Sequence, residues 1–120
     1  MSNLYKEPIK IELNNTFYPK RVKDVMGKKA PKCLYMLGNL ELLNLPGVGF
    51  CGSRKSSIKG LYTVRDCAEQ AANQNISVIS GNAAGIDFEA HFNSLKNGGT
   101  TIFVLPEGIN YFRIKKNLKT

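Results

Sequence analysis

The sequence predicts an α/β fold built on a mostly parallel β-sheet flanked by helices. Three apolar runs with strand character lie at residues 48–51, 76–79 and 101–105, and helical patterns fill the two intervals between them. A strand–helix–strand–helix–strand order requires a parallel sheet, because each helix carries the chain back to the starting edge. Each run is followed by a glycine-bearing turn. Ligands bind outside the carboxyl ends of such strands, so we expect the three turns to converge on one site.

Composition and charge favour a globular protein with an anionic partner. The 120 residues are 42% apolar and 22% charged, which suits one domain with a modest core. Net charge is +8, from 17 Lys and Arg against 9 Asp and Glu, and favours nucleic acid first and a membrane surface second. Plain solubility is the alternative explanation. No apolar run approaches the roughly 20 residues of a membrane helix, and the N-terminus lacks a signal-peptide core. We therefore expect a cytoplasmic protein without a membrane partner.

The cysteines do not indicate a metal site. Cys33, Cys51 and Cys67 are odd in number and far apart, with no CxxC pair or Cys/His cluster. Reduced thiols fit a cytoplasmic protein. Cys51 lies inside an apolar run, so we expect it to be a small buried residue.

The first third of the chain is the least regular part. Residues 1–33 are basic and weakly periodic, and we expect them to form a lead-in packed on a domain over residues 34–120. A short helix is expected around residues 21–26. Residues 34–37 are a candidate fourth strand, and residues 40–45 form one helical turn or a loop.

The central helix is expected to begin after Ser56 or Ser57, because serine is a good N-cap. It ends near residue 73. Its apolar face comprises Ile58, Leu61, Tyr62, Ala68, Ala71 and Ala72. Residues 76–80 follow as a buried parallel strand, since they are rich in β-branched residues and bounded by turn residues.

A second helix is expected over residues 87–97. Ile86, Ala90 and Leu95 are candidates for its buried stripe. The Gly98-Gly99 pair stops the helix by a left-handed glycine cap. Residues 100–105 form the third strand, and a basic tail follows.

The first turn, Gly52-Ser53-Arg54, has the features of a phosphate-binding loop. Glycine lets the backbone turn sharply and approach a ligand. The helix start that follows offers free N–H groups and a positive dipole end. Ser53 and Ser57 add hydroxyls, and the planar fork of Arg54 can grip a phosphate with two bonds. An ordinary turn with a surface arginine is the alternative.

The second turn is a stretch of small residues that ends in an acid. Ser80-Gly81 closes a strand. Residues 83–85 are alanine and glycine, whose small side chains let the backbone pass close to a ligand or a neighbouring segment. Asp87 either caps the helix or bonds to a sugar hydroxyl, a base edge or a neighbouring loop. His91 shares its helix face at i+4. We disfavour acid–base catalysis by this pair, because the sequence places no nucleophile beside it, and we expect no catalytic residue.

The third turn, Pro106-Glu107-Gly108, is expected to form another wall of the crevice. Glu107 would repel a phosphate placed against it. It therefore contacts a base or a sugar, or faces solvent.

These motifs, in this order, resemble the DNA-processing A family (DprA/Smf), which has a single Rossmann-like domain at its core. The resemblance covers roughly residues 17–118. It rests on Tyr18-Pro19, on residues 34–39, on Gly52-Ser53-Arg54 with Ser57 and Gly60, on the twelve-residue motif from Ser80 to His91, and on Gly98-Gly99-Thr100-Thr101-Ile102-Phe103-Val104-Leu105.

The resemblance implies a non-enzymatic protein that binds single-stranded DNA and loads a RecA-type recombinase onto it, in natural transformation or recombination. It implies no cofactor. The basic charge fits this function independently. The predicted phosphate and nucleic-acid site comprises Gly52, Ser53, Arg54, Lys55, Ser57, Gly60, Ser80, Gly81, Asn82, Ala83, Gly85, Asp87 and Gly108. Auxiliary cations come from the tail: Arg113, Lys115, Lys116 and Lys119.

Two departures from the family pattern keep another function open. Ala84 and Phe92 stand where the family usually has basic residues, which favours a sensor domain that binds a free nucleotide in the same crevice. A bare assembly module is the third possibility. A cytokinin-activating phosphoribohydrolase is disfavoured, because its Pro-Gly-Gly-x-Gly-Thr segment is missing.

We also expect a homodimer. The chain stops at Thr120, where the family fold would continue, so we expect a minimal or truncated relative with open strand edges. Open edges and apolar faces cost free energy unless they are covered. A twofold dimer is the commonest closed solution and doubles the basic surface. In the alternative, residues 1–33 cover the edge and leave a monomer.

Overall fold

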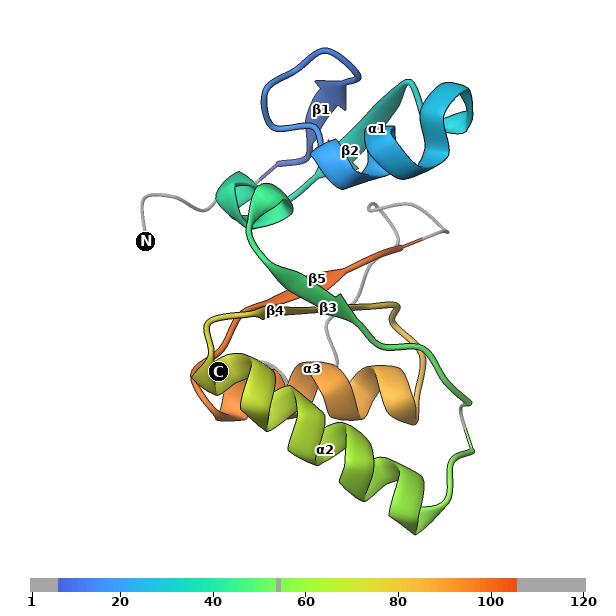
Figure 1. Ribbon diagram of the computed structural model, residues 1–120, viewed down its shortest axis with the longest axis vertical. Coiled ribbons are helices and arrows are strands. Elements are labelled where there is room, and N and C mark those ends of the chain that lie inside the picture. The colour runs from blue at the N-terminus through green and yellow to red at the C-terminus, as the bar shows by residue number, and fades with distance from the viewer. Residues whose placement is uncertain (1–6, 54, 106–120) are drawn as a thin grey trace. The chain divides into compact units, whose positions relative to one another are not determined.

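The computed structural model describes residues 7–53 and 55–105. The chain divides into two compact units, residues 1–45 and residues 46–120, coloured from blue to green and from green to red in Figure 1. The division after residue 33 into a lead-in and a domain stays a prediction. Within the described part of the chain, no helix combines the length and apolarity that crossing a membrane requires.

The N-terminal unit is built on a pair of antiparallel strands. Its elements are β1 (Ile9–Glu12), α1 (Lys20–Met26), the 3-10 helix η1 (Gly27–Lys29), β2 (Cys33–Met36) and the 3-10 helix η2 (Leu40–Asn44). In the strand pair, Ile9 lies opposite Met36 and Ile11 opposite Leu34. The core of the unit consists of Ile11, Tyr18, Leu40 and Leu43.

Two sequence expectations for this region were wrong. The lead-in is not irregular before its helix, because residues 9–12 form β1. The candidate fourth strand, residues 34–37, is indeed a strand, but β2 pairs antiparallel with β1 and does not join the parallel sheet. The strand β1 has only four residues, too few for a clear alternating pattern, and its partner lies far along the chain.

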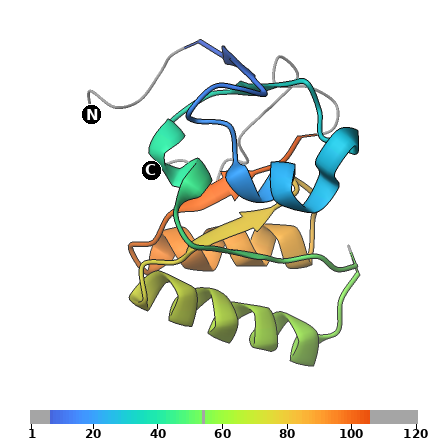
Figure 2. The same cartoon turned by 45° about the horizontal axis from the view of Figure 1, so that its top comes forward.

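The C-terminal unit confirms the predicted α/β class. The strands β3 (Gly47–Gly49), β4 (Ser77–Ser80) and β5 (Thr101–Phe103) form a parallel sheet in that order. The helices α2 (Ile58–Asn73) and α3 (Ile86–Lys96) connect them and lie on the same face of the sheet (Figures 1 and 2). Both crossovers run in one direction across the sheet and are right-handed by general rule, so both helices come to one face.

The core between the helices and the sheet is made of small and β-branched side chains. Its buried members are Val64, Ala68, Ala71, Val78, Ile86 and Ala90. Ala68 and Ala90 are fully buried, which allows the helices to lie close to the sheet. Gly99 extends this packing, because a Cβ there would lie 2.7 Å from the Cβ of Ala72.

Some predicted core positions were wrong. Ile58 and Tyr62 are 75% and 59% exposed, because the buried face of α2 is centred on the i, i+4, i+7 series that begins at Val64. Leu95 is also exposed, and Ser94 takes the inward position, where its hydroxyl donates to Thr100 O at 2.9 Å.

Most helix boundaries agree closely with the sequence signals, but the end of β3 differs from the prediction and this changes the environment of a cysteine. Ser57 caps α2, and Gly98 ends the α3 region with φ of 78°. The strand β3 stops at Gly49, earlier than predicted. Cys51 therefore lies beyond the strand and is exposed, so the prediction that it is buried was wrong.

Candidate functional site

The first two predicted turns begin at the same edge of the parallel sheet. The amide of Phe50, just past β3, donates to Ile79 O at 2.9 Å. The amide of Val104, just past β5, donates to Ser80 O at 2.9 Å. The three strands thus end level with one another. The third turn, residues 106–108, lies outside the described residues.

Close packing joins the turn after β3 to the turn after β4. A Cβ on Gly52 would lie 2.5 Å from Cγ1 of Ile86, so glycine is required for this approach. The amide of Ile86 donates to Ser53 O at 3.5 Å, and the Ser80 hydroxyl lies 2.8 Å from Phe50 O. The two turns therefore form one surface and not two independent loops.

A set of serine hydrogen bonds connects the described residues of the first turn with the start of α2. Ser53 Oγ accepts from Lys55 N at 3.1 Å, and Ser56 Oγ donates to Ser53 O at 2.9 Å. Ser57 Oγ accepts from Gly60 N at 3.0 Å and so caps α2. Sequence reasoning treated Ser56 only as a possible cap and missed its part in the turn, although the Ser-Ser pair before a helix was a visible signal.

The capped start of α2 leaves donors available. No acceptor among the described residues binds the first-turn amides of Ile58 and Lys59, as is usual at a helix start. Ser57 is exposed, and its hydroxyl proton has no acceptor within residues 7–53 and 55–105. Lys55 is exposed beside it. This arrangement suits an oxyanion, because the amides and the helix dipole present positive charge.

Several predicted site residues belong to the segments that the structure does not describe. Arg54 lies outside the described residues, as do Gly108 and the tail cations Arg113, Lys115, Lys116 and Lys119. Their predicted roles stay predictions.

Asp87 braces the second turn from inside. Its Oδ2 accepts from Ala83 N at 3.2 Å, and its Oδ1 lies 2.7 Å from Ser80 Oγ. A Cβ on Gly81 would lie 2.8 Å from Asp87 Oδ2, so the carboxylate sits directly against the backbone. Both carboxylate oxygens are thus engaged with the turn itself.

His91 ties the same turn to β5. The residue is 1% exposed, and Nε2 lies 2.7 Å from Gly81 O. A carbonyl only accepts, so Nε2 carries a proton. Nδ1 hydrogen-bonds to Thr101 Oγ1, and the ring stacks on Phe103 with centroids 3.7 Å apart. The sequence indicated that His91 shares a face with Asp87, but nothing local indicated its partners on β5.

The remaining residues of the second turn are small or partly covered. Asn82, Ala83 and Gly85 are half-buried, and Gly85 has φ of 76° before α3. Ala84 is exposed. Phe92 stacks on Phe88 with ring centroids 5.7 Å apart, one helical turn along α3. Within the described residues, no group of three or more His, Cys, Asp and Glu could hold a metal ion.

Comparison with known proteins shows the family. The model of the DNA recombination-mediator protein A family matches residues 10–120. The chain is 41% identical over 88 residues to the DNA processing protein DprA of Streptococcus pneumoniae, covering 73% of this chain and 31% of that protein. It is 31% identical over 109 residues to the protein Smf of Synechocystis, covering 88% of this chain and 27% of that protein.

A solved structure agrees with these matches. The X-ray structure of DprA from Streptococcus pneumoniae resembles this fold with a TM-score of 0.80 and 34% identity, covering 97% of this chain and 40% of that chain. The chain spans about a third of the length of the curated relatives it matches. With most of its length matched by the family model and its fold shared with a solved member, this chain belongs to the DNA recombination-mediator protein A family, together with the DprA/Smf proteins.

Proposed function

We propose that the chain is a non-enzymatic protein that binds single-stranded DNA at the carboxyl edge of its parallel sheet. The observation that carries the proposal is the start of α2 with the described residues next to it. It presents the amides of Ile58 and Lys59, the Ser57 hydroxyl and the exposed Lys55 together. A backbone phosphate is the ligand that such a helix start favours. Membership of a DNA-processing family supports DNA as the source of that phosphate.

The second turn has a structural part in this proposal. Asp87 and His91 hold its backbone through Ala83, Ser80 and Gly81. A turn braced in this way loses little freedom on binding, which lowers the cost of association. The net charge of +8 adds a salt-sensitive attraction to the strand.

The remaining parts of the proposal rest on the family resemblance of the sequence and on its composition. We propose that the bound strand is passed to a RecA-type recombinase, and that this takes place in the cytoplasm. The described cysteines Cys33, Cys51 and Cys67 are free thiols, which suits a reducing compartment. A nucleotide sensor that uses the same crevice is the competing outcome of the test below.

Two variants of Ser57 separate binding from stability. Ser57→Asp keeps an N-cap of similar quality but places a carboxylate where the phosphate would lie. Like charges in contact cost several kcal/mol, so we expect the affinity for a single-stranded oligonucleotide to fall at least about tenfold. Ser57→Ala should cost about 1 kcal/mol of folding stability and affect binding less.

The measurement is fluorescence anisotropy of a labelled oligonucleotide at two salt concentrations, with thermal unfolding of each variant as the stability control. Wild-type protein that does not bind at low salt would contradict the proposal, and so would Ser57→Asp binding as tightly as wild type. A mononucleotide that raises the unfolding temperature, with no effect of the oligonucleotide, would favour the sensor.

A further inference from the structure

The N-terminal unit contains a concavity that the candidate site does not include. It has a volume of about 800 Å³ and opens to solvent between the β1–α1 connection, α1 and the end of η2. Three cations and a single acid line it: Lys20, Arg21, Lys23 and Asp24. We call the three cations with the concavity they line the basic groove. Its charge is net positive, and every lining residue belongs to the N-terminal unit.

The fold holds the cations of the basic groove in place. Arg21 Nη2 donates to Leu45 O at 2.8 Å. The backbone amide of Lys20 donates to Asn44 Oδ1 at 2.9 Å, which fixes the start of α1. Lys23 Nζ lies 5.6 Å from the ring centroid of Tyr18. Tyr18 is 2% exposed, and its hydroxyl donates to Pro31 O at 2.6 Å.

The positive charge of the basic groove is not neutralised within residues 7–53 and 55–105. In that part of the chain, ion pairs join Lys10 to Glu12 and Arg65 to Glu89, and none involves Lys20, Arg21 or Lys23. Asp24 also lines the groove, but within the described residues it forms no ion pair with them. A guanidinium has five N–H donors, so Arg21 retains donors beyond its bond to Leu45.

We propose that the basic groove is a second phosphate-binding site, in which Arg21 grips the oxyanion while Lys20 and Lys23 neutralise it. Arginine suits this role because its fork matches two phosphate oxygens, and its bond to Leu45 O reduces the freedom lost on binding. A solvated helix face would explain the exposed Lys20 and Arg21, but it would not explain why both line one concavity together with the half-buried Lys23, nor why Arg21 is hydrogen-bonded to Leu45 O. The phosphate belongs either to the DNA strand or to a free anion; for the strand, the inference rests on the proposed function.

Two double variants test the basic groove at equal net charge. Lys20→Gln with Lys23→Gln removes two charges from the groove, and Lys28→Gln with Lys29→Gln removes two from η1, outside it. Glutamine is a good helix former, so α1 should persist. We expect the groove variant to bind a single-stranded oligonucleotide at least about fivefold more weakly than the η1 variant. The slope of log affinity against log salt concentration should also become less negative, by about 0.7 for each phosphate contact that the groove variant loses. Equal losses in the two variants would overturn the proposal.

Nuclear magnetic resonance on the wild-type protein gives an independent readout that does not depend on the variants folding. Amide shifts of Lys20, Arg21 and Lys23 are followed on addition of an oligonucleotide and, separately, of inorganic phosphate, with Lys28 and Lys29 as reference. Shifts with the oligonucleotide identify the strand as the source, and shifts with phosphate alone identify a free anion. If neither probe changes the amide chemical shifts of the groove residues, the inference is overturned. If the oligonucleotide does not bind the wild-type protein anywhere, the proposed function fails, and the phosphate titration alone decides the groove.

Discussion

Gly52 shows, at the scale of one residue, why the turns of the candidate site need glycine. Its φ lies outside the left-handed region, so the requirement is space and not backbone conformation. A Cβ at this position would lie 2.5 Å from Ile86 Cγ1 and 3.0 Å from Ile86 Cβ, and Ile86 is itself buried. The neighbour cannot move away without disturbing the start of α3.

We therefore predict that Gly52→Ala lowers the free energy of unfolding by about 1–3 kcal/mol, the usual cost of overpacking. Urea denaturation measures it. Gly49→Ala is the matched control, since the nearest atom to a Cβ there is Ile79 O at 3.9 Å, an ordinary contact. The control should stay within about 0.5 kcal/mol of wild type. A Gly52→Ala protein as stable as the control would show that the turns are not packed in this way.

Asp87 carries the second residue-scale prediction. Asp87→Ala removes the acceptor of Ala83 N and a partner of Ser80 Oγ, and Ser80 is 4% exposed. Donors left unsatisfied cost about 1–3 kcal/mol, so we expect a loss of this size in chemical denaturation. Asp66→Ala on α2 provides the comparison, because Asp66 is exposed and, within residues 7–53 and 55–105, accepts from the exposed Gln70 alone. Equal effects of the two substitutions would contradict the bracing role.

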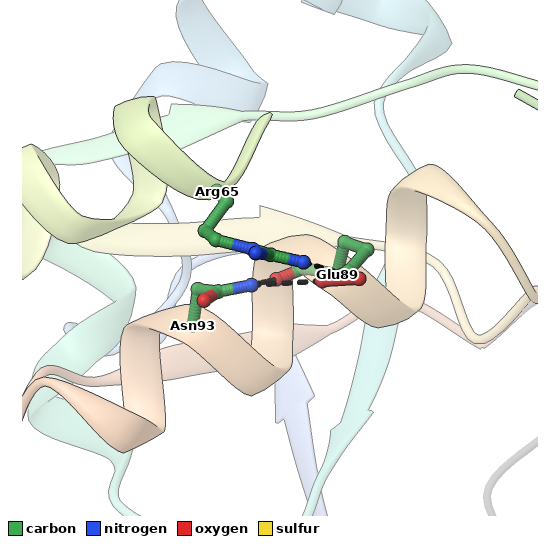
Figure 3. Close-up of polar contacts among 3 residues, drawn as sticks. All are labelled: Arg65, Glu89 and Asn93. Carbon is green, nitrogen blue, oxygen red and sulfur yellow. Dashed lines mark hydrogen bonds and ion pairs between the residues drawn. The ribbon is translucent and has the colours of Figure 1, made fainter. Parts of the chain in front are cut away.

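At the scale of the elements, a polar cluster joins α2 to α3. Figure 3 shows Arg65 on α2 directed toward Glu89 on α3, with Asn93 one turn further along α3. Arg65 Nη2 lies 3.6 Å from Glu89 Oε1, and Asn93 Nδ2 donates to Glu89 Oε2 at 2.9 Å and to Glu89 O at 2.8 Å. The guanidinium also lies 4.9 Å from the Tyr62 ring centroid. The buried partner of Glu89 is thus Asn93, and the exposed partner is Arg65.

We predict that Glu89→Ala costs more stability than Arg65→Ala. The side chain of Glu89 is 18% exposed and bonds to a buried amide, so its loss should cost about 1–2 kcal/mol. The side chain of Arg65 is 46% exposed, and a solvent-screened pair contributes about 0–1 kcal/mol. A double-mutant cycle in urea should give a coupling below about 1 kcal/mol. A larger coupling, or Arg65→Ala being the costlier change, would be inconsistent with this assignment.

At the scale of the whole molecule, we predict a homodimer. Within the described residues, β3 and β5 each pair only with β4, so each has one edge without a strand partner in that part of the chain. Open edges recruit a second chain, and a twofold pair closes the assembly. Light scattering at micromolar concentration should give a mass near twice 13.3 kDa.

Val48→Lys on β3 should shift the mass toward the monomer if this edge is the interface, since a charged residue blocks edge pairing. A wild-type mass near 13.3 kDa would show that the prediction is wrong.

The parallel sheet and its two helices could be predicted because their signals are local. Ser57 precedes the helix it caps, Gly98 has the left-handed conformation expected of a helix stop, and the β-branched run before Ser80 is a buried strand. The pairing of β1 with β2 could not be predicted. Ile9 meets Met36 across an intervening helix, and a strand of four residues carries almost no periodic signal.

The sequence by itself determined that the turns after β3 and β4 lie at the carboxyl edge of the sheet and that small residues line them. Only the tertiary structure decided what those residues do there. Local spacing places Asp87 and His91 on one helix face, but the packing of α3 on the sheet directs one toward Ser80 and the other toward Thr101. The same holds for the basic groove, where α1 and Leu45 meet because the core around Tyr18 brings them together. Contacts between distant segments depend on how side chains fill space, and local periodicity does not encode that filling.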